Sequence, residues 1–129
     1  MKRRDAVAEI LSVNPTSPST PSFVNQDKWW KALNEMRFWW VDRMIKARWT
    51  NRSDDRPSPL EEKMTLFWHS HFASGISKVE DAGAMWSQNN IMRNRGRGKF
   101  GTLLDRVCTN GALLTYLDNN TNVADDPQE

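Results

Sequence analysis

Residues 58–76 read SPLEEKMTLFWHSHFASGI and contain a helix start, a dense group of apolar side chains and both histidines of the chain. Ser58 followed by Glu61 is a capping box, in which the hydroxyl and the carboxylate accept backbone N–H groups that the first helical turn leaves unpaired. Pro59 takes the first helical position, where its missing N–H removes no hydrogen bond. This stretch therefore predicts a helix that begins after Ser58.

The phase of this helix predicts which histidine is buried. At about 100° per residue, one arc contains Leu60, Met64, Phe67, Trp68 and His71. Glu62 and His69 point the opposite way. Because the arc is apolar, we expect it to face the core, with His71 buried and His69 exposed.

His69 and His71 form an H-x-H pair and are the candidates for a catalytic group or a metal ligand. On a helix their imidazoles diverge by about 200°, so both bind one ion only if the helix unwinds at Ser70. Apolar neighbours would keep His71 neutral and available as a base or a ligand. A hydrogen-bonded core histidine is the commoner arrangement.

The N-terminal part divides into an arm and a long helix. Residues 1–25 are expected to form an arm with a linker rich in Pro, Ser and Thr, which sustains neither a helix nor a sheet. Asp27 is a candidate cap for a helix that runs to about Trp49, either continuous or broken near Asn34. A core-facing stripe is predicted on it: Trp29, Leu33, Met36, Trp40 and Met44. The tryptophan pairs also suit a stacking platform for carbohydrate or bases, but core packing is favoured.

Three further helices are predicted downstream. A second capping box, Ser77 with Glu80, predicts a helix from there to about Arg95. The next is expected to bury Phe100, Leu103, Leu104 and Val107, and to end at Cys108 as a small buried hydrophobe. Residues 112–117 form a last short helix. With no alternating apolar pattern, the chain is predicted to be all-α, an irregular bundle of five or six helices without a sheet, with residues 26–117 as the helical domain and 118–129 as a polar tail.

Residues 93–99, RNRGRGK, form a local basic run. Cations at a helix C-terminus complement its dipole, which explains the run structurally. The alternative is a phosphate or nucleic-acid patch of Arg93, Arg95, Arg97 and Lys99. Because no aromatic residue interleaves the arginines and the formal net charge is only +2, nucleic acid is not favoured as a partner.

The tail is a weak candidate for calcium binding. Asp118, Asn120, Asn122 and Glu129 fall at positions 1, 3, 5 and 12 of a calcium loop, while Asp125 falls at position 8 and Asp126 at position 9. Val123 stands where such a loop needs glycine, and no helix follows Glu129. Chance in a tail rich in Asp and Asn therefore explains the match better.

The composition limits other classes of function. Cys108 is the only cysteine, so no disulfide within the chain and no thiolate zinc cluster is possible. No apolar run reaches the roughly 18 residues of a membrane span, and no apolar signal segment follows the basic start of the chain. We expect a chain that is soluble as given, in a compartment that the sequence leaves undetermined. Phosphate-binding loops and common hydrolase motifs are absent from the sequence.

The pattern PLxEKMTLFWHxHF within residues 59–72 resembles a bacterial family of uncharacterised proteins, domain of unknown function 1800. Asn110 and Gly111 depart from it, since the family usually has Asp-Pro there, and Leu113 replaces a favoured Met. The resemblance implies a helical fold, and relatives are often exported. Its later blocks are Lys78, Val79, Gln88, Asn89, Arg93, Gly98, Phe100, Leu103, Leu104, Ala112, Leu114, Tyr116, Leu117, Asp118, Asn119 and Asn122.

In the family these blocks lead into a further helix, which would begin at Pro127, so the chain looks like a truncated piece of a longer protein. Two hypotheses for its function follow. One is a tryptophan-rich scaffold or interaction module, inactive alone, whose partners are the remainder of its own chain or another protein. The other is part of a hydrolytic or metal-dependent enzyme around His71, completed by that further helix. The sequence leaves undetermined whether a cofactor is bound.

Overall fold

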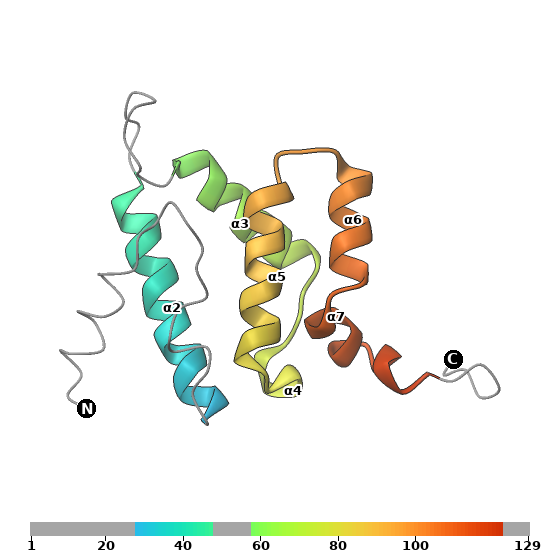
Figure 1. Ribbon diagram of the computed structural model, residues 1–129. Helices are drawn as coiled ribbons and strands as arrows, with labels where there is room; N and C mark the ends of the chain where they lie inside the picture. Colours follow the sequence, from blue (N-terminus) through green and yellow to red (C-terminus); the bar gives the residue numbers. More distant parts are fainter. Residues whose placement is uncertain (1–27, 48–57, 123–129) are drawn as a thin grey trace.

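The computed structural model describes residues 28–47 and 58–122, and within these ranges the chain is all-α, as predicted (Figure 1). The described residues contain six α-helices and no strand. A 3-10 turn, η2, follows these helices at Asn119–Thr121. The helices are α2 (Trp29–Lys46), α3 (Pro59–His71), α4 (Ile76–Val79), α5 (Ala82–Arg95), α6 (Phe100–Cys108) and α7 (Gly111–Tyr116). The division into arm, helical domain and tail stays a prediction.

Helix α5 is the central element of the bundle. It contacts every other α-helix of the described residues, and in Figure 1 it stands between α2 and α6 with α3 crossing behind it. Its side chains at 88, 89 and 93 are buried although they are polar. A helix enclosed on most sides has to place some polar groups in the interior, and those groups need partners there.

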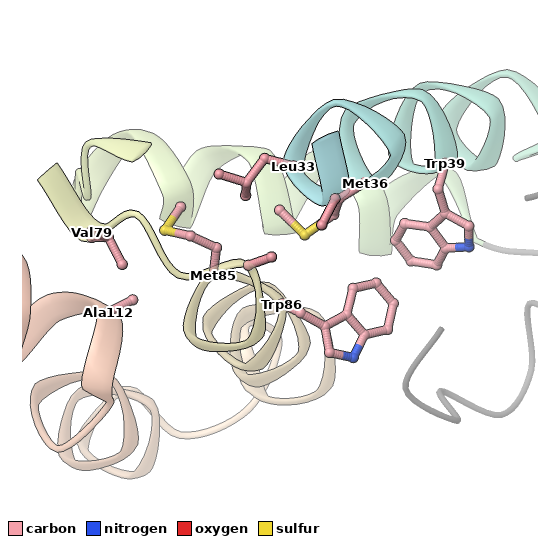
Figure 2. Close-up of a cluster of buried hydrophobic side chains, with 9 residues drawn as sticks. Leu33, Met36, Trp39, Val79, Met85, Trp86 and Ala112 are labelled. Carbon is pink, nitrogen blue, oxygen red and sulfur yellow. The ribbon is translucent and has the colours of Figure 1, made fainter. Parts of the chain in front are cut away.

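Two apolar clusters pack against α5. The first joins α2 to α4, α5 and α7 (Figure 2), and in it the indoles of Trp39 and Trp86 meet edge to face, with ring centroids 4.7 Å apart. The second joins α5 to α6 and α7, and consists of Met92, Leu103, Val107 and Leu113. Edge-to-face indoles are a favoured aromatic geometry. Together the clusters fix the positions of α2 and α6 on α5.

Helix α2 is continuous and ends at Lys46, so it neither breaks near Asn34 nor extends toward Trp49. Asp27 and Trp49 lie outside the described residues. The predicted stripe is only partly right: Leu33 and Met36 are buried, whereas its other members are partly exposed. The buried face is rotated toward Trp39 and Arg43, which pack against α5 and α3.

The capping box predicted at Ser77 is wrong. Ser77 lies inside the short helix α4, which ends at Val79 and is followed by Glu80 in the left-handed conformation with φ 51°. Asp81 caps α5 instead, because its carboxylate accepts the backbone N–H of Ala84 at 3.0 Å. An aspartate with an extended backbone is about as effective a helix cap as a serine.

The expected burial of α6 is also only half right. Leu103 and Val107 are buried, but Phe100, Leu104 and Cys108 are exposed. Only the side of α6 that faces α5 and α7 is covered, and Leu103 and Val107 share that side because they are four residues apart. Cys108 follows about 100° farther round the helix, outside the covered side.

We predict opposite effects for alanine at two glycines. At Gly96 a Cβ would lie 2.4 Å from the Met92 carbonyl oxygen and 2.6 Å from Cδ1 of Trp68, whereas at Gly101 it meets nothing within 4 Å. Gly96→Ala should therefore lower the free energy of unfolding by about 1–3 kcal/mol. Gly101→Ala should raise it by about 0.5–1 kcal/mol, since Gly101 is in a helix. Urea unfolding followed by circular dichroism measures both, and equal effects would contradict the packing around Trp68.

Candidate functional site

A buried carboxylate, Glu62 of α3, lies at the junction of three helices. Its exposed fraction is 2%. Oε1 accepts hydrogen bonds from Nε of Arg43 on α2 and from Nε of Arg93 on α5, the latter at 3.2 Å. Oε2 accepts from Nη2 of Arg93 at 3.2 Å and from the Trp40 indole at 2.8 Å. Four donors from two helices thus converge on one carboxylate.

Arg93 extends this network to His69. Its Nη1 donates to Oδ1 of Asn89, and Nδ2 of Asn89 lies 3.0 Å from Nε2 of His69. Because Arg93 occupies the amide oxygen, the amide nitrogen has to face His69 and donate to it. Nε2 of His69 is therefore an acceptor, and the neutral ring has its proton on Nδ1. We call Glu62, Arg43, Arg93, Trp40, Asn89 and His69 the Glu62 cluster.

One indole packs against both guanidinium groups. The guanidinium carbons of Arg93 and Arg43 lie 5.0 and 5.7 Å from the Trp39 ring centroid. Trp39 thus gives both buried cations an attractive aromatic face. The Trp40 ring lies 4.9 Å from the ring of His69.

The charges shift the pKa values of the cluster. Burial acts to raise the pKa of Glu62, but the hydrogen bonds and charges of Arg93 and Arg43 outweigh it, so this pKa is lowered. Burial also lowers the pKa of Arg93, although Glu62 opposes that shift. Burial, reinforced by the charge of Arg93, lowers the pKa of His69 to about 4. Glu62 is thus a saturated anion and His69 a neutral ring at neutral pH.

Such an arrangement binds helices together and is unsuited to proton transfer by Glu62. A general base needs a free lone pair near its substrate and a pKa near the working pH. Both oxygens of Glu62 are occupied, and its pKa moves away from neutrality. The cluster therefore acts as an internal support.

The predicted phase of α3 is inverted. Glu62 and Thr65 are buried and His69 is partly buried, whereas Leu60, Phe67 and His71 are exposed. The expectation that His71 is buried and His69 exposed was wrong. The Glu62 cluster is the physical cause of the observed orientation of α3. The arginines of α2 and α5 can be paired in the interior only if the carboxylate face of α3 turns inward.

The two candidate histidines do not converge. Helix α3 is regular through Ser70 to His71, so the rings point to different sides. His71 lies among aromatic rings, with centroid distances of 4.9 Å to Phe72 and 5.7 Å to Trp68. In the ranges 28–47 and 58–122, no group of three or more His, Cys, Asp or Glu residues is arranged to bind a metal ion.

The other candidates lie at separate places. Asp118 has φ 60° and forms an ion pair of 2.6 Å with Lys78, while Asn120 and Asn122 are exposed. Asp125 and Glu129 lie outside the described residues. The four cations of the basic run separate: Arg93 is buried in the cluster, Arg97 reaches Glu61 at 3.3 Å, and Arg95 and Lys99 are exposed.

Glu62 and Arg43 are site residues that were not predicted from the sequence. The helical phase placed Glu62 on the solvent side, and no local pattern singled out Arg43. A partial signal existed, because Asn89 and Arg93 belong to the blocks of the family resemblance and lie one helical turn apart. Two polar residues on one face of a helix with apolar neighbours indicate an interior polar contact, but not its partner.

Comparisons with known proteins identify only the family. The family model described as protein of unknown function (DUF1800) matches residues 2–129. No curated protein matches the chain. No solved structure matches it either.

We predict that Glu62→Gln is strongly destabilising. Removing the charge takes the counter-ion from the buried guanidinium of Arg93 and one of its carboxylates from buried Arg43, which still pairs with Glu61, and this costs about 3–5 kcal/mol. Glu61→Gln is the matched control, because this carboxylate also contacts Arg43 and Arg97 but is more exposed, and its loss should cost roughly 1 kcal/mol or less. Chemical unfolding monitored by tryptophan fluorescence compares them. Equal losses of unfolding free energy in the two variants would contradict the central position of Glu62.

We also predict a loss of stability in mild acid that depends on His69. With a pKa of about 4 in the folded chain and about 6.5 when unfolded, His69 takes up its proton in the unfolded chain first. Stability should therefore fall by roughly 2–3 kcal/mol between pH 6.5 and pH 4. The lowered pKa of Glu62 acts in the same direction at lower pH, since its contribution is lost as pH falls below about 4.5.

The variants His69→Gln and His71→Gln distinguish the contributions of the two histidines to this pH dependence. In His69→Gln the dependence of the unfolding free energy on pH between 6.5 and 4 should be much flatter than in the parent chain. His71→Gln should retain it. A parent-like pH dependence in His69→Gln would show that another group takes up the proton.

Proposed function

The chain belongs to the family described as protein of unknown function (DUF1800), and we propose that it serves as a helical interaction module whose docking surface is the outer side of α2. Such a module needs no catalytic group of its own. The partner is a helix, either from elsewhere in a longer chain or from another protein.

The observation that supports this proposal is a second apolar stripe on α2. Trp30, Phe38, Val41 and Ile45 are 53%, 59%, 50% and 74% exposed. At 100° per residue these four side chains fall within an arc of about 80°. We call them the outer stripe of α2. Its centre lies opposite the buried face that contains Leu33 and Met36.

The spacing of the outer stripe suits a helical partner. Asn34, Phe38, Val41 and Ile45 follow one another at intervals of four, three and four residues, the repeat by which two helices pack side by side. Isolated exposed apolar residues are ordinary, but a contiguous row on one helix is typical of an interaction surface. Asn34 would add a polar contact that selects the register of the partner.

The Glu62 cluster would give this surface a fixed position. Arg43 and Trp40 of α2 bind Glu62 of α3, and Trp39 of α2 packs on Trp86 of α5. Both sets of contacts are on the inner side of α2. A helix restrained on its inner side presents its outer side with little loss of conformational freedom on binding.

The alternative, a hydrolytic or metal-dependent enzyme with its site around His71, would need groups supplied from outside the described residues. His71 has only aromatic rings among its contacts within the part of the chain that the structure describes. No contact there favours this alternative. It would gain support if a full-length relative retained metal through the position of His71.

Photo-crosslinking tests the proposal in cells that produce the protein. A photoreactive residue replacing Ile45 should give discrete crosslinked species, because Ile45 lies in the outer stripe. The matched control replaces Lys46, which is also exposed but lies about 100° round the helix. Val41→Lys combined with the probe at 45 should abolish the species. Identical crosslinks from both positions, or none from 45, would contradict the proposal.

None of the helices in the described part of the chain is long and apolar enough to cross a membrane.

A further inference from the structure

A second exposed surface combines aromatic rings with cations. Phe67, Trp68 and His71 of α3 and Phe100 of α6 form it, with Trp68 and Phe100 stacked at 5.8 Å and Phe67 and His71 stacked at 6.3 Å. Phe67 is 54% exposed and Phe100 is 52% exposed. We call these four residues the aromatic patch. It lies outside the outer stripe of α2.

The structure brings the basic run against these rings. Nε1 of Trp68 donates to the carbonyl oxygen of Gly96 at 2.7 Å, so the loop between α5 and α6 passes beside the indole. Alanine at 96 would collide with the same indole, which shows how closely the loop and the ring approach. Lys99 directly precedes Phe100. The loop that carries Arg97 and Lys99 therefore runs beside an aromatic ring, although no aromatic residue interleaves the cations in the sequence.

The charge around the patch is positive. Five exposed cations belong to α3, to α6 and to the end of α5 with the segment that joins it to α6, and two carboxylates outside the Glu62 cluster, Glu61 and Asp105, oppose them. Arg97 is half exposed while it contacts Glu61. The difference, five positive charges and two negative charges, is larger than the formal net charge of +2 of the whole chain. The five cations are Lys63, Arg95, Arg97, Lys99 and Arg106.

We propose that the aromatic patch and its bordering cations bind single-stranded nucleic acid. Unpaired bases expose flat faces that stack on aromatic side chains, while lysine and arginine bind the phosphates between them. The half-exposed rings of Phe67 and Phe100 supply two stacking positions, on α3 and α6. Arg95, Arg97 and Lys99 supply the charge along the loop that joins α5 to α6.

Single strands fit this surface better than a duplex or a membrane. A duplex hides its base faces, so exposed rings would add nothing to its binding. Membrane insertion favours a continuous apolar face bordered by cations, whereas here Glu61 pairs with Arg97 among the bordering cations and would have to be desolvated. The proposal does not depend on the interaction module, because the outer stripe of α2 contributes no residue to it.

Fluorescence anisotropy of labelled oligothymidylate of about 15 nucleotides tests the proposal, with the full chain at low and moderate salt. Binding should weaken as salt is added, because phosphate contacts release counter-ions. Phe100→Leu and Phe67→Leu retain an apolar side chain without a ring, and each should weaken binding about 5- to 50-fold if bases stack there. Arg97→Gln should weaken binding and reduce its salt dependence.

Phe38→Leu on the outer stripe of α2 is the control, since Phe38 is as exposed as the patch phenylalanines, and its affinity should equal that of the parent chain. Circular dichroism verifies that every variant is folded. Binding lost in the patch variants and retained in Phe38→Leu would support the proposal. It would be overturned by no binding at low salt, by parent affinity in both patch variants, or by tighter binding to duplex DNA, inorganic polyphosphate or anionic vesicles.

Discussion

The pairing of Glu62 with Arg43 and Arg93 is the constraint on which the other contacts of the bundle depend. A carboxylate and two guanidinium groups leave water together, which is unfavourable unless each finds its partners. Only one orientation of α3 satisfies this condition, with its carboxylate face turned toward α2 and α5. Because the donors come from both of these helices, the cluster fixes three helices relative to one another at one point.

The same constraint creates the exposed surfaces. Turning Glu62 inward turns Phe67 and His71 outward, and the aromatic patch is the result. On α2, Arg43 binds the cluster from the inner side, so the row that ends at Ile45 faces away. A small helical bundle that placed its apolar residues only inside would have neither surface. The proposed functions of this chain therefore both follow from its internal ion pairing.

The sequence was sufficient for the fold class and for most of the helices, because local patterns determine them. Pro59 marks the start of α3, and Leu103 with Val107 marks the inner side of α6. It was insufficient for the site, since hydrophobic periodicity assumes that the apolar arc faces inward. Glu62 violates this assumption because its partners are 19 and 31 residues away along the chain. No local pattern contains such a pairing.

Histidine modification by diethyl pyrocarbonate, read by mass spectrometry, tests the orientation of α3 most directly. The two histidines are on one helix and differ in their surroundings, so each serves as the control for the other. If Glu62 faces inward, exposed His71 should be modified rapidly, and His69, which is partly buried and whose Nε2 lone pair accepts from Asn89, should react slowly until the chain unfolds. Faster modification of His69 than of His71 in the folded chain would mean that the apolar arc faces the core, and would contradict the account.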